Sequence, residues 1–384
     1  MANFEFATAA RIVFGAGALK QIGALASEYG QRALLVVGGS VGRAESLLGY
    51  LSAAGLEVTV FSVQHEPTIA LAQAGREAAL SSRAQMVVGF GGGSALDAAK
   101  AIAALATNPG DPLDYLEVIG KAQPLTRAPL PILAIPTTAG TGSEVTRNAV
   151  LASPEAQVKV SMRHLLMLPR VALIDPELTY GLPAPITAST GMDALTQNIE
   201  PYTCNAPNPI VDALAAQGIQ RAARSLRRAY EQPHDVQARE DMALASLLGG
   251  LSLANAKLGA VHGFAAPIGG MFSVPHGAVC AALLPHVMRA NIEAAQEAQR
   301  QDIVERYVQV ARWLTDDPQA SAQNGVDWVL ALSQVLAIPP LSAYGIGEAH
   351  IDELVDKAAR ASSMKGNALV LSALRLRAIL EAAL

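Results

Sequence analysis

The chain has 384 residues, which at roughly 150 residues per domain indicates two domains or three. Apolar residues make up 51% and charged residues 16%, the opposite of the balance that disorder requires, so a large core is expected. The net charge of −5 and an aromatic content of 4% argue against a nucleic-acid-binding protein, which usually carries a basic face and aromatic side chains that stack on bases.

The first half of the chain alternates strand and helix patterns. Short apolar runs predict strands that are buried on both faces, and alanine- and leucine-rich segments with helical spacing predict helices between them. Strands alternating with helices in this way indicate βαβ units and a parallel sheet. The predicted strands are 32–38, 57–61, 85–90, 131–135 and 171–174, and the predicted helices are 44–54, 70–81 and 95–107.

The pattern changes near residue 182, where prolines cluster at Pro183 and Pro185. Beyond residue 186 there is almost no strand pattern, and apolar residues recur at helical spacing. The sequence therefore predicts an α/β domain with a parallel sheet over residues 1–182 and an all-helical domain over residues 183–384. The predicted helices of the second domain are 212–230, 242–257, 277–291, 303–314, 326–336 and 351–361.

Three consecutive glycines, Gly91, Gly92 and Gly93, follow a predicted strand and precede a predicted helix. Without Cβ atoms the backbone can approach a phosphate closely and direct N–H groups at it. Ser94 to Asp97 fits the S-x-x-D pattern of a capping box at the start of a helix. A turn that serves packing alone is the alternative, and the chain has no G-x-G-x-x-G fingerprint.

A second loop, over residues 136–144, is rich in threonine and glycine and follows the strand at 131–135. Open α/β sheets bind ligands at the carboxyl ends of their strands. Hydroxyl groups there can hydrogen-bond a ribose or a pyrophosphate. The two loops together favour a nucleotide site.

The second half contains a candidate metal site. Asp193 and Gln197 are four residues apart on one helix face, and His262 and His276 each precede a glycine. One carboxylate and two imidazoles suit Fe(II) or Zn. The alternative is that both histidines are hydrogen-bonded residues of the core.

Four segments occur in the order and spacing of a known family. They are GGGSALDAAK (91–100), PTTAGTGSEVT (136–146), GMDAL (191–195) and VHGFAAPIGGMFSVPHG (261–277). Over about residues 12–291 the chain resembles the iron-containing, or group III, alcohol dehydrogenases. The resemblance implies the dehydroquinate-synthase-like architecture, with the active site in the cleft between the two domains. It also implies NAD(P)-dependent, metal-assisted hydride transfer between a small alcohol and its aldehyde or ketone.

The resemblance also implies roles for individual residues. The metal ligands would be Asp193, His262 and His276, which are also the catalytic residues, with Gln197 at the fourth ligand position. The pyrophosphate would lie on Gly91, Gly92, Gly93 and Ser94. The rest of the cofactor would contact Gly38, Gly39, Ser40, Asp97, Thr137, Thr138, Thr141, Asn148 and Lys159.

Two positions depart from the family pattern. Gln197 replaces a histidine, and an amide oxygen is a poorer donor than imidazole for Fe(II) or Zn. We therefore expect a weakly bound metal, with water or the Gln197 oxygen in the fourth place. Ala266 replaces another histidine that many members have, so no proton relay can run through that side chain.

The segment from Gly38 to Arg43 bears on the choice of cofactor. NAD-preferring members tend to have an acidic residue just after the first strand, where it repels a 2′-phosphate. Here no carboxylate is present, and Arg43 can pair with that phosphate. The sequence favours NADP(H) over NAD(H).

The remaining expectations concern partners and location. We expect a small-molecule alcohol or carbonyl substrate, no nucleic-acid or membrane partner, and a homodimer or larger homo-oligomer, as is usual in the family. The N-terminus lacks a signal-peptide pattern, and Cys204 and Cys280 form no CxxC motif, which fits the cytoplasm. The alternative functions are a catalytically silent dinucleotide-binding protein with a decayed metal site, and a lyase of the dehydroquinate-synthase type.

Overall fold

The computed structural model describes residues 3–384, which form two compact units. An α/β unit comprises Ala7–Thr138 and Gly142–Thr179. A helical unit comprises Tyr180–Leu384, together with Ala139–Thr141 and the N-terminal segment that ends at Phe6. Because two short segments of the first half belong to the helical unit, no single boundary in the sequence describes the division.

A six-stranded parallel sheet forms the centre of the α/β unit within the described residues, in the order β1-β8-β5-β4-β2-β3. β6 and β7 form a separate antiparallel pair. The strands are β1 (Arg11–Phe14), β2 (Arg32–Gly38), β3 (Glu57–Val63), β4 (Met86–Gly91), β5 (Ile132–Pro136), β6 (Asn148–Ser153), β7 (Val158–Arg163) and β8 (Val171–Ile174).

All five predicted strands are present as β2, β3, β4, β5 and β8. β1 was not predicted, because it is a four-residue edge strand whose side chains are mostly exposed and so lacks a buried run. The β6–β7 pair was also not predicted. β6 is only six residues long, and its buried and half-buried residues alternate, so it does not have the pattern of a strand buried on both faces.

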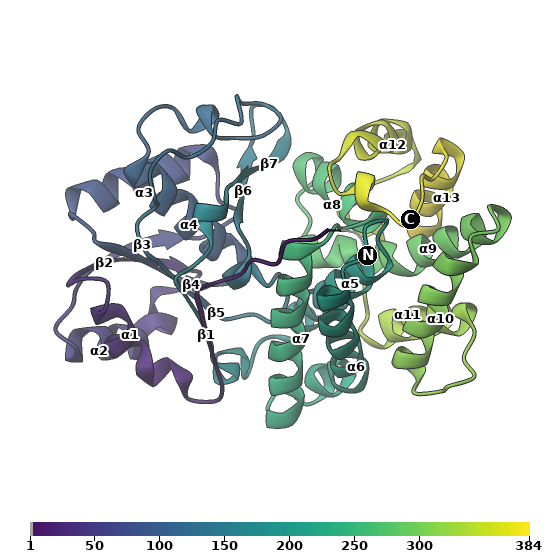
Figure 1. The fold of residues 1–384 in the computed structure, drawn as a ribbon, viewed down its shortest axis with the longest axis horizontal. Helices are drawn as coiled ribbons and strands as arrows, with labels where there is room; N and C mark the ends of the chain where they lie inside the picture. The colour runs from purple at the N-terminus through teal and green to yellow at the C-terminus, as the bar shows by residue number, and fades with distance from the viewer. Residues whose placement is uncertain (1–2) are drawn as a thin grey trace. The chain divides into compact units, whose positions relative to one another are not determined.

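Helices cover both faces of the sheet (Figure 1). α1 (Ile22–Ser27) and α2 (Glu45–Ala53) pack with Leu35 and Val37 of β2 on one face. α3 (Ile69–Ser81) and α4 (Gly93–Thr107) pack with Leu34 and Val36 on the other. Successive side chains of a strand point to opposite faces, so a continuous apolar run such as β2 serves both layers.

The helical unit has one continuous core, in which α5 contacts α6, α7 and α9. All six predicted helices are present. No range was predicted for α5, α8 or α13, and in α8 Pro267 and several glycines interrupt the helical pattern. The helices are α5 (Ala184–Thr203), α6 (Pro209–Glu231), α7 (Val236–Asn255), α8 (Ala260–Met271), α9 (His276–Glu297), α10 (Gln301–Thr315), α11 (Ala322–Val335), α12 (Ile351–Arg360) and α13 (Ala373–Ala383).

No single helix among residues 3–384 is long and apolar enough to cross a bilayer. α7 and α8, which meet at a bend of 95°, pass that test of length and composition only as a pair.

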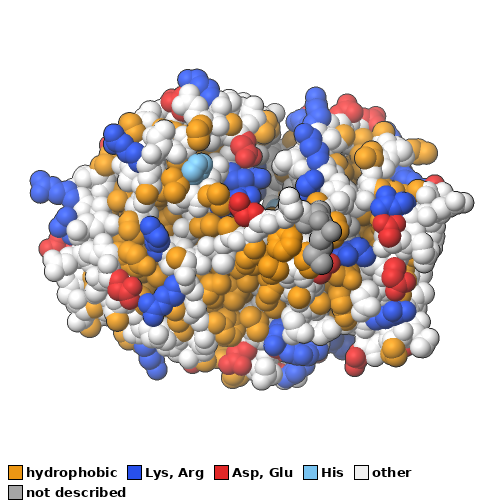
Figure 2. Space-filling view, in the orientation of Figure 1, with side chains coloured by type: hydrophobic (Ala, Val, Ile, Leu, Met, Phe, Trp, Pro, Cys, Tyr) orange, Lys and Arg blue, Asp and Glu red, His pale blue; other side chains and the backbone are white. Residues whose placement is uncertain are grey.

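Charged side chains of both signs are interspersed over the face shown in Figure 2. On α6, two arginines converge on one buried carboxylate. Asp241 of α7 accepts hydrogen bonds from Arg221 (2.6 Å), Arg224 (2.7 and 2.8 Å) and Ser225 (2.7 Å). This network joins α6 to α7. Burial alone would raise the pKa of Asp241, but these hydrogen bonds hold it below its usual value.

Replacing Asp241 with Ala removes the partner of both arginines. We expect Asp241→Ala to lower the free energy of unfolding of the helical unit by about 2–3 kcal/mol, because polar groups that lose a buried partner stay desolvated. In thermal melts followed by circular dichroism this is a drop of about 5 °C or more. The matched control is Glu231→Ala, which breaks the exposed Arg227–Glu231 pair and should change little. Equal drops in the two variants would contradict this account.

Candidate metal centre

Helix α5 carries three polar side chains into the core of the helical unit. Asp193, Gln197 and Glu200 are spaced by four and three residues, so they lie along one face of the helix. All three are at least 95% buried, at 2%, 2% and 5% exposure. Buried carboxylates are costly unless a partner compensates them. A functional partner is therefore expected on this face.

The two histidines come from the starts of two other helices. His262 is the third residue of α8, and His276 is the first residue of α9. Next to His276, a Cβ at Gly277 would lie 2.2 Å from the Ser189 carbonyl oxygen of α5. Only glycine allows the first turn of α9 to approach α5 so closely. This approach places His276 beside Asp193.

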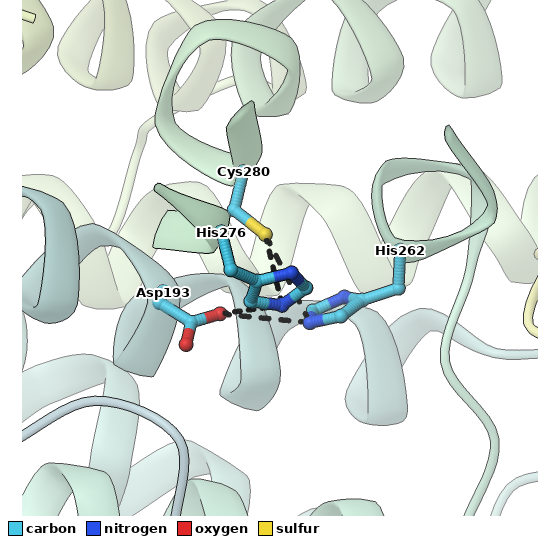
Figure 3. A group of neighbouring side chains, drawn as sticks. All are labelled: Asp193, His262, His276 and Cys280. Atoms are coloured by element: carbon cyan, nitrogen blue, oxygen red, sulfur yellow. Dashed lines mark hydrogen bonds and ion pairs between the residues drawn. The ribbon is translucent and has the colours of Figure 1, made fainter. Parts of the chain in front are cut away.

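Three donor atoms converge, as Figure 3 shows. Asp193 Oδ1 lies 3.6 Å from His262 Nε2 and 3.7 Å from His276 Nε2. Both separations are too long for a hydrogen bond. The buried Asp193 Oδ1 therefore has no hydrogen-bond partner among residues 3–384, and neither has Gln197 Oε1. A cation beside Asp193 Oδ1 would satisfy an oxygen that otherwise has no partner, so the residues fit a metal ion.

Glu200 holds one of the imidazoles in place. Its Oε2 lies 2.6 Å from His262 Nδ1, and its Oε1 accepts a hydrogen bond of 2.7 Å from the Val261 backbone N–H. With Nδ1 donating to the carboxylate, the lone pair of Nε2 points into the cluster. This carboxylate–histidine arrangement is typical of metal sites.

The cluster favours positive charge. The pKa of His276 is raised to about 8, first by the nearby Cys280 and then by Asp193, against the effect of burial. Burial would raise the pKa of Asp193, but the two imidazoles lower it. The electrostatic environment of these side chains therefore favours a divalent cation.

Two residues of the cluster were missed by the sequence analysis, Glu200 and Cys280. Cys280 Sγ lies 3.7 Å from His276 Nε2 and 4.0 Å from His262 Nε2. The signal for Cys280 was its position four residues after His276 on one helix. The signal for Glu200 was its place two helical turns after Asp193.

The predicted phosphate loops lie together in the α/β unit. Gly91 has a φ of +152°, and a Cβ there would lie 3.1 Å from Gly38 backbone atoms. Thr138 Oγ1 would be 3.3 Å from a Cβ at Gly92. Since β2, β4 and β5 are neighbours in the sheet, the loops that follow them meet at one edge.

The predicted capping box at Ser94 and Asp97 is wrong. α4 begins at Gly93, with Gly92 as its N-cap and no side-chain cap. Asp97 instead accepts hydrogen bonds from Ser143 Oγ (2.5 Å) and the Val150 N–H (3.0 Å) and pairs with Lys100 (3.0 Å). Its carboxylate therefore joins α4 to the segments that follow β5.

The other expected cofactor residues are dispersed. Thr137 is buried and donates its backbone N–H to the Gly91 carbonyl oxygen, whereas Thr141 belongs to the helical unit. In the β6–β7 pair, Asn148 is opposite Arg163 and Lys159 is opposite Ala152, so Asn148 and Lys159 are about 13 Å apart along the strands. Lys159 pairs with Glu66 at 3.4 Å.

Comparisons with known proteins cover both units. The model of the family "Iron-containing alcohol dehydrogenase" matches residues 9–176, and that of "Fe-containing alcohol dehydrogenase family, C-terminal" matches residues 187–384. The 1,3-propanediol dehydrogenase of Citrobacter freundii is 36% identical over 90% of this chain and 89% of its own length.

Solved structures agree with these matches. A crystal structure of a 1,3-propanediol oxidoreductase has a TM-score of 0.93 and 34% identity, with 100% of both chains covered. The sulfoacetaldehyde reductase of Bifidobacterium kashiwanohense in complex with NAD⁺ has a TM-score of 0.88 and 28% identity, covering 100% of this chain and 99% of that one.

The expected fold class is thereby confirmed, and the dehydrogenase function is favoured over the lyase and the silent binding protein. The chain belongs to the iron-containing alcohol dehydrogenase family and is an NAD(P)-dependent, metal-assisted alcohol oxidoreductase.

Proposed function

We propose that the chain interconverts a small alcohol and its aldehyde or ketone at the cluster of Asp193, His262 and His276. The observation that carries the proposal is the convergence of three donor atoms from three helices around an orphaned, buried Asp193 Oδ1. A divalent metal bound there supplies Lewis-acid stabilisation of the negative charge that develops on the alcohol oxygen.

The side chains around the cluster have distinct tasks in this proposal. Asp193 contributes the negative charge that retains the cation, and Glu200 fixes the orientation of His262. Ala266 carries no titratable group, so the alcohol proton leaves through water or a ribose hydroxyl of the cofactor.

The loops after β2, β4 and β5 are the proposed dinucleotide site. These loops contain glycines, which have no Cβ atom, so phosphates can approach the backbone N–H groups closely. The glycines are Gly38, Gly39 and Gly91–Gly93. We assign Asp97 a positioning role, because both of its carboxylate oxygens are already engaged. For Ser40, Ser94, Thr137, Thr138, Thr141, Asn148 and Lys159, contact with the cofactor rests on the family resemblance.

Removal of either imidazole tests the metal-assisted reaction. We expect His262→Ala and His276→Ala each to lower kcat/KM at least about a thousandfold, because Lewis-acid stabilisation is worth several kcal/mol. Binding of NAD(P)H, followed by its fluorescence, should be unchanged. His234→Ala, at an exposed histidine in the α6–α7 connection, is the control. Full activity in both site variants would refute the proposal.

The Gly38–Arg43 segment supports a preference for NADP(H). Gly39 has a φ of +73°, and a Cβ there would meet nothing within 4 Å, so a side chain fits in space. We expect kcat/KM to be higher with NADPH than with NADH. We expect Gly39→Asp to reverse that order by repelling the 2′-phosphate. Gly39→Asn is the matched control, since Asn has the same shape and also tolerates positive φ. A tenfold preference of the unaltered enzyme for NADH would refute this.

We also propose a homo-oligomeric, cytoplasmic enzyme. The location is supported by the two cysteines, Cys204 and Cys280, which form no disulfide, as is usual in the reducing cytoplasm. Support for assembly is that β1 lies at a sheet edge, with Ile12 and Phe14 37% and 38% exposed. Light scattering coupled to size exclusion should give a multiple of 39.8 kDa. The mass of a single chain would contradict the proposed assembly.

A further inference from the structure

Cys280 shares the centre of the donor cluster with the three expected ligands. Cys280 is fully buried, at 0% exposure. One donor atom from each of Asp193, His262, His276 and Cys280 lies within 4.8 Å of the others. Figure 3 shows the sulfur directed toward the imidazole of His276.

The local sequence places the sulfur there. His276 and Cys280 are one helical turn apart on α9, so their side chains lie on the same face. The close approach of α9 to α5 at Gly277 brings that face to Asp193. The imidazole and the thiol therefore reach the cluster together, as a His-x-x-x-Cys pair on one rigid helix.

The separations have the scale of a coordination shell. A tetrahedral ion with bonds of about 2.0–2.3 Å to N, O and S has donor-to-donor distances of about 3.3–3.6 Å. Here the carboxylate–imidazole distances are 3.6 and 3.7 Å, and the thiol–imidazole distances are 3.7 and 4.0 Å. These four separations are within a few tenths of an ångström of the coordination range, and the remaining two, between Asp193 and Cys280 and between the two imidazoles, are at most 4.8 Å.

The residue at the family's fourth ligand position is a weaker candidate. The Nε2 group of Gln197 donates a hydrogen bond of 3.2 Å to the Gly140 carbonyl oxygen. The atom that Gln197 could offer to a metal is its neutral amide oxygen. A thiolate binds Zn far better than an amide oxygen does, and a thiol that coordinates a metal is deprotonated.

We propose that Cys280 supplies the fourth donor as a thiolate, which replaces the imidazole that Gln197 cannot provide. The soft sulfur donor shifts the ion preference of the site from Fe(II) toward Zn. The inference rests on the proposed function, because it assumes that Asp193, His262 and His276 hold a divalent ion. It revises the expectation that water or the Gln197 oxygen fills the fourth place.

Cobalt substitution tests the sulfur ligand directly. The full chain is stripped of metal, loaded with one equivalent of Co(II) under reducing, anaerobic conditions, and its absorption spectrum is recorded. Thiolate coordination gives a near-ultraviolet sulfur-to-cobalt charge-transfer band, in addition to the visible d–d bands of any tetrahedral Co(II). We expect the unaltered chain to show both.

Three variants identify the source of the band. Cys280→Ser should lose the charge-transfer band while it keeps the d–d bands. Cys204→Ser is the matched control, since it removes the other buried cysteine, and it should keep both. Gln197→Ala should also keep the charge-transfer band. If Cys280→Ser does not fold, the unaltered chain and Cys204→Ser still decide whether a thiolate is bound and which cysteine supplies it.

Metal competition supplies a second readout without activity. With Zn and Fe(II) offered together, we expect the bound Zn-to-Fe ratio to fall in Cys280→Ser, because the variant loses the soft sulfur donor that favours Zn. Gln197→Ala should leave the ratio unchanged.

The possible failures are distinguishable. Tetrahedral Co(II) in the unaltered chain without a charge-transfer band would overturn the Cys280 assignment and leave the proposed function standing. A visible spectrum that changes in Gln197→Ala but not in Cys280→Ser would do the same and assign the fourth donor to Gln197. Failure of the unaltered chain to bind Co(II) or Zn at all would overturn the proposed metal-assisted reaction and this inference with it.

Discussion

The close contact between the first turn of α9 and helix α5 is the constraint on which the site depends. At Gly277 the two backbones are so close that a Cβ would lie 2.2 Å from a carbonyl oxygen. Any other residue would push the helices apart. His276 and Cys280 would then move away from Asp193, and the donor distances near 3.7 Å would be lost.

Helix α5 combines two tasks in that arrangement. Asp193 offers an oxygen that no other described group satisfies, and Glu200, two turns later, fixes the tautomer and ring orientation of His262. The candidate ligand Asp193 and the supporting Glu200 lie on one helix inside a continuous apolar core, so helix periodicity sets their relative geometry. The hydrogen bonds between Asp241 and its two arginines join the neighbouring helices α6 and α7 to each other.

The sequence predicted the regular parts of this structure well, for identifiable reasons. β2 and β8 contain uninterrupted apolar runs, the pattern that is typical of a strand buried on both faces. β1 and β6 also contain short apolar runs, of three and four residues, but their side chains are largely exposed or half-buried in alternation, and neither strand was predicted. The predicted start of α4 was two residues too late because Ser94 resembles a cap, whereas the N-cap in the fold is Gly92.

The candidate site was less predictable than the fold. Asp193, His262 and His276 were singled out by residue type and family motif, and the structure brings them together from three helices. Cys280 and Glu200 carry no motif. Their importance depends on which helix faces meet in space, and that is decided by packing between residues as far apart as α5 and α9. For Asp97 a contact with the cofactor was predicted, and the structure adds a second role, because its two oxygens accept hydrogen bonds from Ser143 and the Val150 N–H.

All four donors around the candidate ion come from one unit of the chain, and the glycine loops after β2 and β4 come from the other. Each set is held by its own apolar core. The residues that could change the bound ion are therefore different from the residues that could change the choice of nucleotide. Substitutions at the proposed ion donors on α5 and α9 therefore need not touch the Gly38–Arg43 segment that we propose for the choice of coenzyme.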